Sequence, residues 1–315
     1  MAEQGVSNSI DALSRQLAAA VERVSPAIVA LDARPRVRTS GVIWRAGVVV
    51  STNHTVRRDE EITVALHDGR ELEATLAGRD PGTDLAVLRY DSGESLDESG
   101  VAARGDAASL KVGHLVLAVG RAHPARGVSA GFGIVGAVAG EWRTWRGGRI
   151  DRGIRPDVSI FVGFSGGALV DTEGRVIGVN TTGLARGAGL TIPASTVDRV
   201  VDHLLQHGRV ARPYLGVGMN NRIALPEKLR EKFNLQQASG LMILSVEADG
   251  PADRAGIMIG DILLALGDAA VADSDAGQAV LASLEVGAAV KARILRGGEL
   301  REVEIALGER PARRR

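Results

Sequence analysis

The chain has 315 residues and a formal net charge of zero, and its hydrophobic and charged fractions, 45% and 24%, are those of an ordinary globular protein. At about 150 residues per domain, this length predicts two domains. Zero net charge gives no global attraction for nucleic acid or an anionic membrane. The lack of cysteine excludes disulfides and thiol catalysis. No apolar run reaches the roughly 20 residues of a membrane span.

The first predicted element is an amphipathic helix over residues 11–24, because Leu13, Leu17 and Val21 recur at helical spacing before Pro26. After it, short runs of Val, Ile and Leu alternate with glycine turns. A chain with 40 glycines and 3% aromatic residues that repeats such runs is typical of a β-barrel or sandwich. The predicted strands lie at residues 41–44, 47–51, 62–66, 84–88, 115–119, 133–138 and 176–180.

A second helix is predicted over residues 194–206, because it follows Pro193 and stops at His207-Gly208. Beyond Pro213 the pattern changes to strands that enclose helical stretches at 226–233 and 275–284, which indicates a small α+β module. The predicted organisation is a helical segment, a β domain, the α+β module and a basic, solvated tail, over residues 1–25, 26–208, 212–308 and 309–315 respectively.

The strongest motif is G-F-S-G-G at residues 163–167, which contains the candidate nucleophile Ser165. It also satisfies G-x-S-x-G, the nucleophile elbow of α/β-hydrolases, but an elbow requires a helix directly after the serine. Here residues 168–180 predict strand, turn and strand. The elbow is therefore rejected, and a plain glycine turn between strands remains the structural alternative.

A serine hydroxyl needs a base to take its proton and a third group to orient that base. His54 follows a strong predicted strand, whereas the other five histidines lie in turns or at helix ends. Asp84 precedes the apolar strand that begins at Leu85, where an acid can be partly buried and act on an imidazole. On its own Asp84 would be an ordinary turn acid, and its interpretation depends on His54 and Ser165.

The chain order His54, Asp84, Ser165 is that of two-barrel serine proteases. With these residues the sequence resembles the HtrA (Deg) family, and the resemblance covers roughly residues 10–308. It implies a mainly β protein, in which a chymotrypsin-like double β-barrel is followed by a small α+β PDZ domain. The segments that carry it are residues 39–43, 52–54, 80–87, 105–106, 112–113, 116–120, 163–170, 178–181, 251–256 and 260–263.

The resemblance implies a serine endopeptidase that cleaves unfolded or exposed polypeptides. Ser165 would attack the scissile carbonyl, His54 would transfer the proton, and Asp84 would orient the imidazole. The amides of Gly163 and Ser165 would form the oxyanion hole. A strand edge at Leu190, Thr191 and Ile192 would pair with the substrate backbone, and segments 159–162 and 181–189 would wall a pocket for small or medium apolar side chains.

The resemblance also implies partners. The loop formed by Tyr214, Leu215, Gly216 and Val217 would receive the carboxylate of a peptide C-terminus in the PDZ domain. The predicted helix over residues 11–24 would help to assemble a homotrimer. No histidines or carboxylates fall at the H-E-x-x-H spacing of a zinc site, so neither a metal nor a cofactor is expected.

The sequence departs from the family at residues 161–164, which read Phe-Val-Gly-Phe where the family typically has Asn-Pro-Gly-Asn. The departure places a large ring, Phe164, next to the nucleophile in sequence. It leaves open a second function, a catalytically weak relative that acts as a peptide-binding chaperone or adaptor. The first residues, Met1 to Gly5, lack the basic and apolar regions of a secretory signal. The sequence as given therefore predicts a cytoplasmic protein, with the cell envelope as the alternative if a leader is missing.

Overall fold

The protein is described in a computed structural model over residues 2–91, 100–122, 127–144, 146–185, 189–210 and 213–309. The chain forms two compact units, Met1–Val210 and Ala211–Arg315. The predicted basic tail, apart from Glu309, lies outside the described residues.

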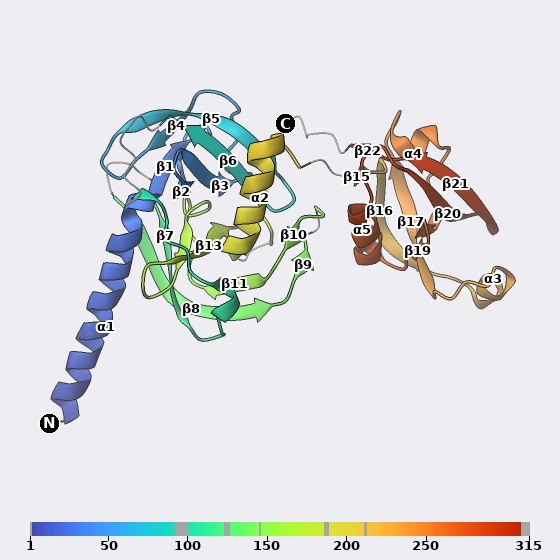
Figure 1. Cartoon of the computed structure of the whole chain (residues 1–315). Coiled ribbons are helices and arrows are strands. Elements are labelled where there is room, and N and C mark those ends of the chain that lie inside the picture. The colour runs from blue at the N-terminus through green and yellow to red at the C-terminus, as the bar shows by residue number, and fades with distance from the viewer. Residues whose placement is uncertain are drawn as a thin grey trace. The chain divides into compact units, whose positions relative to one another are not determined.

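Six antiparallel strands close the first barrel of the N-terminal unit (Figure 1). Strand β3 shows why its sequence is continuously apolar. Val49 packs inside the barrel, whereas Val48 and Val50 pack in a core shared with the second barrel, so both faces are covered. The spatial order is β1 (Ile28–Asp32), β2 (Thr39–Arg45), β3 (Val48–Thr52), β6 (Leu85–Tyr90), β5 (Glu71–Asp80) and β4 (Ile62–Ala65).

The second barrel of this unit is also closed by six antiparallel strands, and Val135, Ile154 and Leu169 pack inside it. Two short strands, β9 (Trp142–Arg143) and β10 (Arg149–Ile150), form a separate hairpin between β8 and β11 in sequence. The spatial order of the barrel is β11 (Gly153–Asp157), β14 (Leu190–Pro193), β13 (Val176–Thr181), β12 (Ala168–Val170), β7 (Leu115–Gly120) and β8 (Ser129–Ala139).

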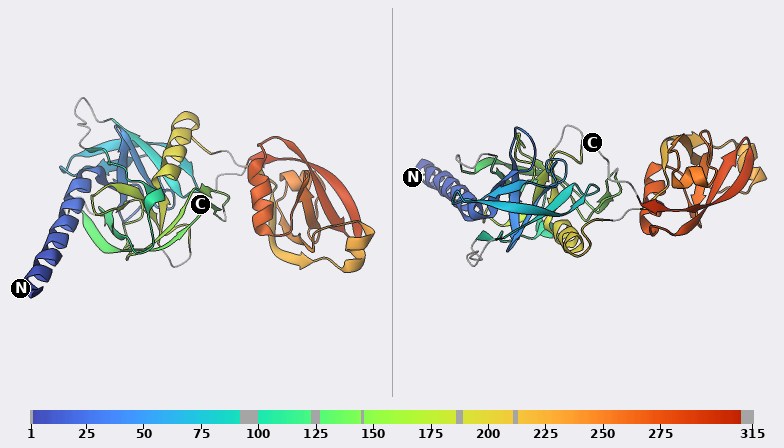
Figure 2. Two further views of the ribbon diagram at one scale, coloured as in Figure 1. Left: turned by 60° about the horizontal axis from the view of Figure 1, so that its bottom comes forward. Right: turned by 90° about the horizontal axis from the view of Figure 1, so that it is seen from above.

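Helices lie outside the two barrels. Helix α1 (Ala2–Val24) starts earlier than the sequence predicts and leads away from the barrels in both views of Figure 2. The 3-10 turn η1 (Ser25–Ala27) joins it to β1, and another, η4 (Ala107–Ser109), precedes β7. Helix α2 (Ala194–His207) ends at Gly208, whose φ of 73° suits glycine, as the sequence predicts. None of the helices in the described ranges is long and apolar enough to cross a bilayer.

The C-terminal unit is a small α+β module, and its main sheet follows the order β16 (Val217–Ala224), β17 (Ser239–Val246), β18 (Ile262–Leu266), β20 (Ala289–Arg296) and β21 (Glu299–Ala306). Strand β19 (Ala269–Ala270) pairs with β18, and β15 (Pro213–Tyr214) pairs with β22 (Gly308–Glu309). The helices are α3 (Glu227–Lys232), α4 (Pro251–Arg254) and α5 (Ser274–Ser283). The predicted architecture, two barrels followed by an α+β module, is confirmed.

Candidate active site

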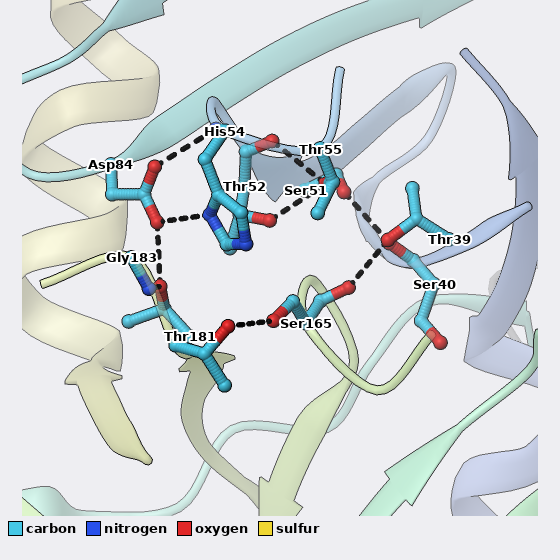
Figure 3. A network of polar contacts seen from close by, with 11 residues as sticks. Thr39, Ser40, Ser51, Thr52, His54, Thr55, Asp84, Ser165, Thr181 and Gly183 are labelled. Atoms are coloured by element: carbon cyan, nitrogen blue, oxygen red, sulfur yellow. Dashed lines mark hydrogen bonds and ion pairs between the residues drawn. The ribbon is translucent and has the colours of Figure 1, made fainter. Parts of the chain in front are cut away.

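His54 lies in the turn that follows β3. The amides of Thr55 and Val56 donate to the carbonyl of Thr52 and close this turn. The His54 amide donates to Asp84 Oδ1 at 2.9 Å, and His54 Nδ1 lies 2.7 Å from Asp84 Oδ2 (Figure 3). A carboxylate accepts, so in this contact Nδ1 is the donor, and Nε2 has no hydrogen-bond partner among the described residues.

Asp84 is buried, with its side chain 1% exposed, and it lies at the entrance to β6. Its φ of 60° is in the left-handed region, an uncommon conformation for a residue other than glycine. The Asn53 amide donates to its carbonyl, and the Thr181 hydroxyl donates to Oδ2 at 2.5 Å. These contacts from two barrels hold the carboxylate against the imidazole.

The separate hairpin β9–β10 supports the turn that carries Asp84. The buried Thr144, between β9 and β10, donates its hydroxyl hydrogen bond to the Gly82 carbonyl at 2.7 Å. Gly148 approaches Gly82 so closely that a β-carbon there would lie 2.2 Å from Gly82 backbone atoms. The hairpin thus fixes the turn only two residues before Asp84, a contact that local sequence patterns do not predict.

Ser165 lies in the loop between β11 and β12 and is 5% exposed. Its carbonyl accepts from the Thr39 hydroxyl at 2.8 Å, across the barrels. Gly166 has a φ of 88°, and a β-carbon there would lie 2.1 Å from the Ser40 carbonyl, so only glycine fits. The Ser165 hydroxyl lies 3.2 Å from the Thr182 hydroxyl, and among the described residues this is its hydrogen bond.

The structure therefore brings His54, Asp84 and Ser165 into one polar network, drawn in Figure 3. Thr181 contacts Asp84, and the next residue, Thr182, contacts Ser165. The network differs from the predicted triad in one respect. Within the described chain, the Ser165 hydroxyl is paired with Thr182 and not with His54.

The residues before Ser165 form a tight turn. The Phe164 amide donates to the Phe161 carbonyl, and Gly163 at the third position has a φ of 93°, as in a type II turn. The Gly163 carbonyl accepts from both the amide and the hydroxyl of Ser40. The amides of Gly163 and Ser165 have no acceptor among the described residues, so both are available to a ligand oxygen.

Phe164 does not lie beside the nucleophile as a cleft residue, as its place in the sequence suggests. Its ring is 4% exposed and packs in the core of the second barrel with Val116 and Leu169. The exposed ring of Phe161 meets it edge to face, with the ring centroids 5.6 Å apart. The ring of Phe164 is therefore accommodated by burial, whereas Phe161 and Val162 remain exposed.

A buried arginine, which the sequence analysis did not single out, lies behind this turn. Arg121 is 3% exposed, its amide donates to the Ser40 hydroxyl, and its Nε donates to the Ile28 carbonyl at 2.7 Å. Its Nη2 contacts the carbonyl and hydroxyl of Ser25 in η1. Burial lowers the pKa of the guanidinium from its ordinary value. The junction of α1 is thereby connected to the loop of Ser165 through Ser40.

The predicted substrate-pairing strand is part of the second barrel. Leu190, Thr191 and Ile192 form β14, which lies between β11 and β13 in the closed barrel. Its recorded pairing with β11 is one residue pair, Ile154 with Thr191, and substrate pairing at this strand stays a prediction. The two predicted pocket walls do meet: a β-carbon at Gly189 would lie 2.4 Å from the Ile160 side chain. Residues 186–188 of that wall lie outside the described residues.

The predicted carboxylate loop of the C-terminal unit connects β15 to β16. Leu215 is buried, and Gly216 has a φ of 79°. The carbonyls of Leu215 and Gly216 accept from Ala252 and Glu247, whereas their amides have no acceptor among the described residues. Strand β16 lies at the edge of its sheet, so the loop leads directly into an edge strand. In the described part of the chain, no group of three or more His, Asp or Glu residues is arranged to bind a metal.

Two domain families match the chain: the trypsin-like peptidase domain over residues 39–179 and the PDZ domain over residues 213–307. Among solved structures, the HtrA-type protease AlgW with a decapeptide is 30% identical with a TM-score of 0.69, and the match covers 94% of this chain and 99% of that chain. The serine endoprotease from Yersinia pestis is also 30% identical, with a TM-score of 0.71 and coverages of 94% and 98%. The chain belongs to the HtrA family of trypsin-like serine proteases with a PDZ domain.

Curated relatives of this HtrA-family chain are longer than it is. A probable periplasmic DegP-like serine endoprotease of Rickettsia conorii is 32% identical over 271 residues, which are 84% of this chain and 52% of the relative. The Do-like serine protease HtrB of Bacillus subtilis is 33% identical over 286 residues, or 85% and 61%. The chain thus spans between about half and about three-fifths of the length of these relatives.

The predicted cytoplasmic location is wrong. Relatives from Rickettsia conorii, Halomonas elongata and Pseudomonas putida are named periplasmic serine endoproteases, which points to the periplasm. The prediction relied on the composition of the first five residues. Export is directed by segments that are removed from the mature protein, so the folded domains carry no record of it.

Proposed function

We propose that this protein is a serine endopeptidase that cleaves unfolded or exposed polypeptides through an acyl-enzyme on Ser165. The observation that carries the proposal is that the adjacent residues Thr181 and Thr182 connect the His54–Asp84 pair with Ser165, and that the amides of Gly163 and Ser165 have no acceptor among the described residues. The names of its relatives, serine endoproteases of the DegP and Do types, support the same reaction.

In the proposed reaction, His54 Nε2 takes the proton of the Ser165 hydroxyl while Ser165 Oγ attacks the scissile carbonyl carbon. The tetrahedral oxyanion accepts hydrogen bonds from the amides of Gly163 and Ser165. His54 then passes the proton to the leaving amine, and the acyl-enzyme is hydrolysed by a water that His54 deprotonates. Asp84 holds the Nδ1 proton throughout and stabilises the charged imidazolium.

The PDZ unit is proposed to bind peptide C-termini and so to select substrate or regulate cleavage. The free amides of Leu215 and Gly216 suit a carboxylate, and the β16 edge suits the rest of an extended peptide. The relative AlgW is described in complex with a decapeptide. We place the reaction in the periplasm, in line with the names of the relatives.

The proposed assembly is a homotrimer that uses α1. Ile10 and Leu13 on this helix are 62% and 38% exposed. They fall on the same face of the helix as Leu17, which packs on the barrel core. An apolar stripe that continues beyond the barrels fits a contact with another copy of the chain. Size-exclusion chromatography with light scattering tests this directly: wild type should elute at three times 32.9 kDa and Ile10→Asp at the mass of one chain.

The decisive test is cleavage of unfolded casein by wild type beside Ser165→Ala, together with a diphenyl phosphonate probe and mass spectrometry. The proposal requires cleavage by wild type alone and probe attached to Ser165. The second candidate, a catalytically weak peptide-binding chaperone, is favoured by the pairing of Ser165 with Thr182. It would be supported if neither protein cleaves casein or takes the probe while both prevent the aggregation of an unfolded client.

A further inference from the structure

The hydroxyl of Ser165 has a partner that the proposed mechanism does not use. Ser165 Oγ and Thr182 Oγ1 lie 3.2 Å apart, and either atom can be the donor. A serine hydroxyl has one proton, and attack requires that this proton face His54 Nε2. When Ser165 donates this proton to Thr182, the proton does not face His54, and this rotamer is not the one that reacts.

Thr182 is held in place by its two neighbours. Thr181 donates to Asp84 Oδ2 at 2.5 Å, and the Gly183 amide donates to the Thr181 hydroxyl at 2.9 Å. Gly183 lies so close to the pair that a β-carbon there would be 2.5 Å from Asp84 Oδ2 and 2.7 Å from His54 Nδ1. The backbone on both sides of Thr182 is thus fixed against the His54–Asp84 pair.

When Ser165 is the donor, Thr182 Oγ1 and His54 Nε2 compete as acceptors for its one proton. The base, His54, is fixed by two hydrogen bonds to Asp84, and the backbone on both sides of Thr182 is fixed by contacts with the same pair. Rotation of the Ser165 side chain about one bond decides which acceptor its proton faces. The free-energy difference between the two rotamers is small, because a neutral hydrogen bond changes such an equilibrium by only about two- to tenfold.

We propose that Thr182 is a positioning residue that holds the Ser165 hydroxyl away from His54 in the unliganded protein. The inference rests on the proposed peptidase function and adds a resting state to it. A substrate carbonyl that enters the site accepts from the Gly163 and Ser165 amides and lies beside the reactive rotamer of Ser165, and the contact with Thr182 is then lost. The resting protein is accordingly less nucleophilic than the protein engaged with substrate.

The test is the second-order rate constant for phosphonylation of Ser165 by a diphenyl phosphonate with a valine side chain, in the absence of substrate. Thr182→Val removes the hydroxyl at nearly constant volume and should raise this rate about two- to tenfold. Thr182→Ser keeps the hydroxyl and should match wild type. Thr75→Val, on the exposed side of β5, is the matched control and should also match wild type.

A merely structural role for Thr182 predicts the opposite sign, because a distorted site reacts more slowly. The midpoint of the pH profile of phosphonylation should not move in Thr182→Val, since the His54–Asp84 contacts remain. A rate in Thr182→Val and in Thr182→Ala at or below wild type overturns the inference. Absence of labelling in every protein, wild type included, overturns the peptidase function itself and the inference with it.

Discussion

A single residue, Asp84, connects the two barrels through its hydrogen bonds. Its two carboxylate oxygens accept from three donors, the amide and Nδ1 of His54 and the hydroxyl of Thr181. Its φ of 60° costs roughly 1–2 kcal/mol in an L-residue, and these hydrogen bonds offset that cost. The conformation aims the carboxylate at the imidazole.

We expect Asp84→Asn to lower kcat by about 10⁴-fold with little change in KM. An amide offers one oxygen to three donors, so the imidazole loses the partner that keeps its proton on Nδ1. Steady-state cleavage of a peptide substrate measures this, with the exposed Asp68→Asn as a control that should behave as wild type. A loss smaller than tenfold would mean that the imidazole is oriented without the carboxylate.

Phe164 provides a second residue-scale prediction, this time of stability. Phe164→Ala should lower the free energy of unfolding of the N-terminal unit by about 3–5 kcal/mol, because the ring fills the second barrel. Phe161→Ala is the matched control: that ring is 60% exposed and should cost less than about 1 kcal/mol. Urea unfolding followed by tryptophan fluorescence distinguishes them. Equal effects would show that the Phe164 ring is not a core residue.

Some of the site could be predicted from the sequence and some could not, for physical reasons. His54 and Asp84 lie next to strongly patterned strands and Ser165 lies in the G-F-S-G-G motif, so local patterns supplied the candidates and their order along the chain connected them. Thr182 and Arg121 act through contacts with distant segments, and no local pattern predicts these. Phe164 was misjudged because adjacency to Ser165 in sequence says nothing of which way a ring faces.

At the scale of elements, strand β2 of the first barrel holds the loop of Ser165 in the second barrel by hydrogen bonds. Thr39 donates to the Ser165 carbonyl, and the next residue, Ser40, holds the Gly163 carbonyl with both its amide and its hydroxyl. The loop of Ser165 therefore takes its shape from a strand that lies far away in the sequence.

Ser40→Ala should lower kcat about tenfold in a protein that still folds, because the Gly163 carbonyl keeps only one of its two donors and the Arg121 amide loses its acceptor. The oxyanion amide of Gly163 is then less firmly placed. Kinetics on a peptide substrate measure this, with Ser109→Ala, an exposed hydroxyl of η4, as the control. An unchanged kcat would mean that Thr39 and the turn alone position the loop.

Strands with both faces buried, such as β3, were predicted because such apolar runs are visible in any window of the sequence. Strands β1, β5 and β11 were not predicted, and β5 alternates between buried and exposed residues. Whether a strand is central or at an edge depends on partners that are remote in the chain. Strand β14 illustrates this, since its neighbours in the barrel are β11 and β13. Helix α1 was expected to begin at residue 11, but it begins at Ala2, ahead of the clear apolar spacing.

At the scale of the whole molecule, the two units have separate cores, and all three tryptophans, Trp44, Trp142 and Trp145, belong to the N-terminal unit. The C-terminal unit contains a buried ion pair in which Asp261, 1% exposed, lies 2.7 Å from Arg296. Burial by itself raises the pKa of Asp261, but the hydrogen bonds from Arg296 and the Met258 amide outweigh it and hold the pKa below its ordinary value.

A carboxyl group whose pKa is lowered by folding stabilises the folded state at pH values above its unfolded pKa of about 3.9. This stabilisation is lost as the pH falls through the pKa of the folded state. Asp261→Asn should therefore destabilise the C-terminal unit by about 1–3 kcal/mol at about pH 6, and the difference should shrink toward about pH 3. Hydrogen exchange followed by mass spectrometry measures the stability of the C-terminal unit. Tryptophan fluorescence, which reports the other unit, should not change, and Glu299→Gln on an exposed pair is the control.

The long sequence separations within the site have a consequence for how the chain folds. Thr39 and Ser165 are 126 residues apart, Ser40 and Gly163 are 123 apart, and Asp84 and Thr181 are 97 apart. Contacts of this kind close large loops and form late, after the local hairpins. We therefore expect that a newly made chain has no complete catalytic site until both barrels have formed and met.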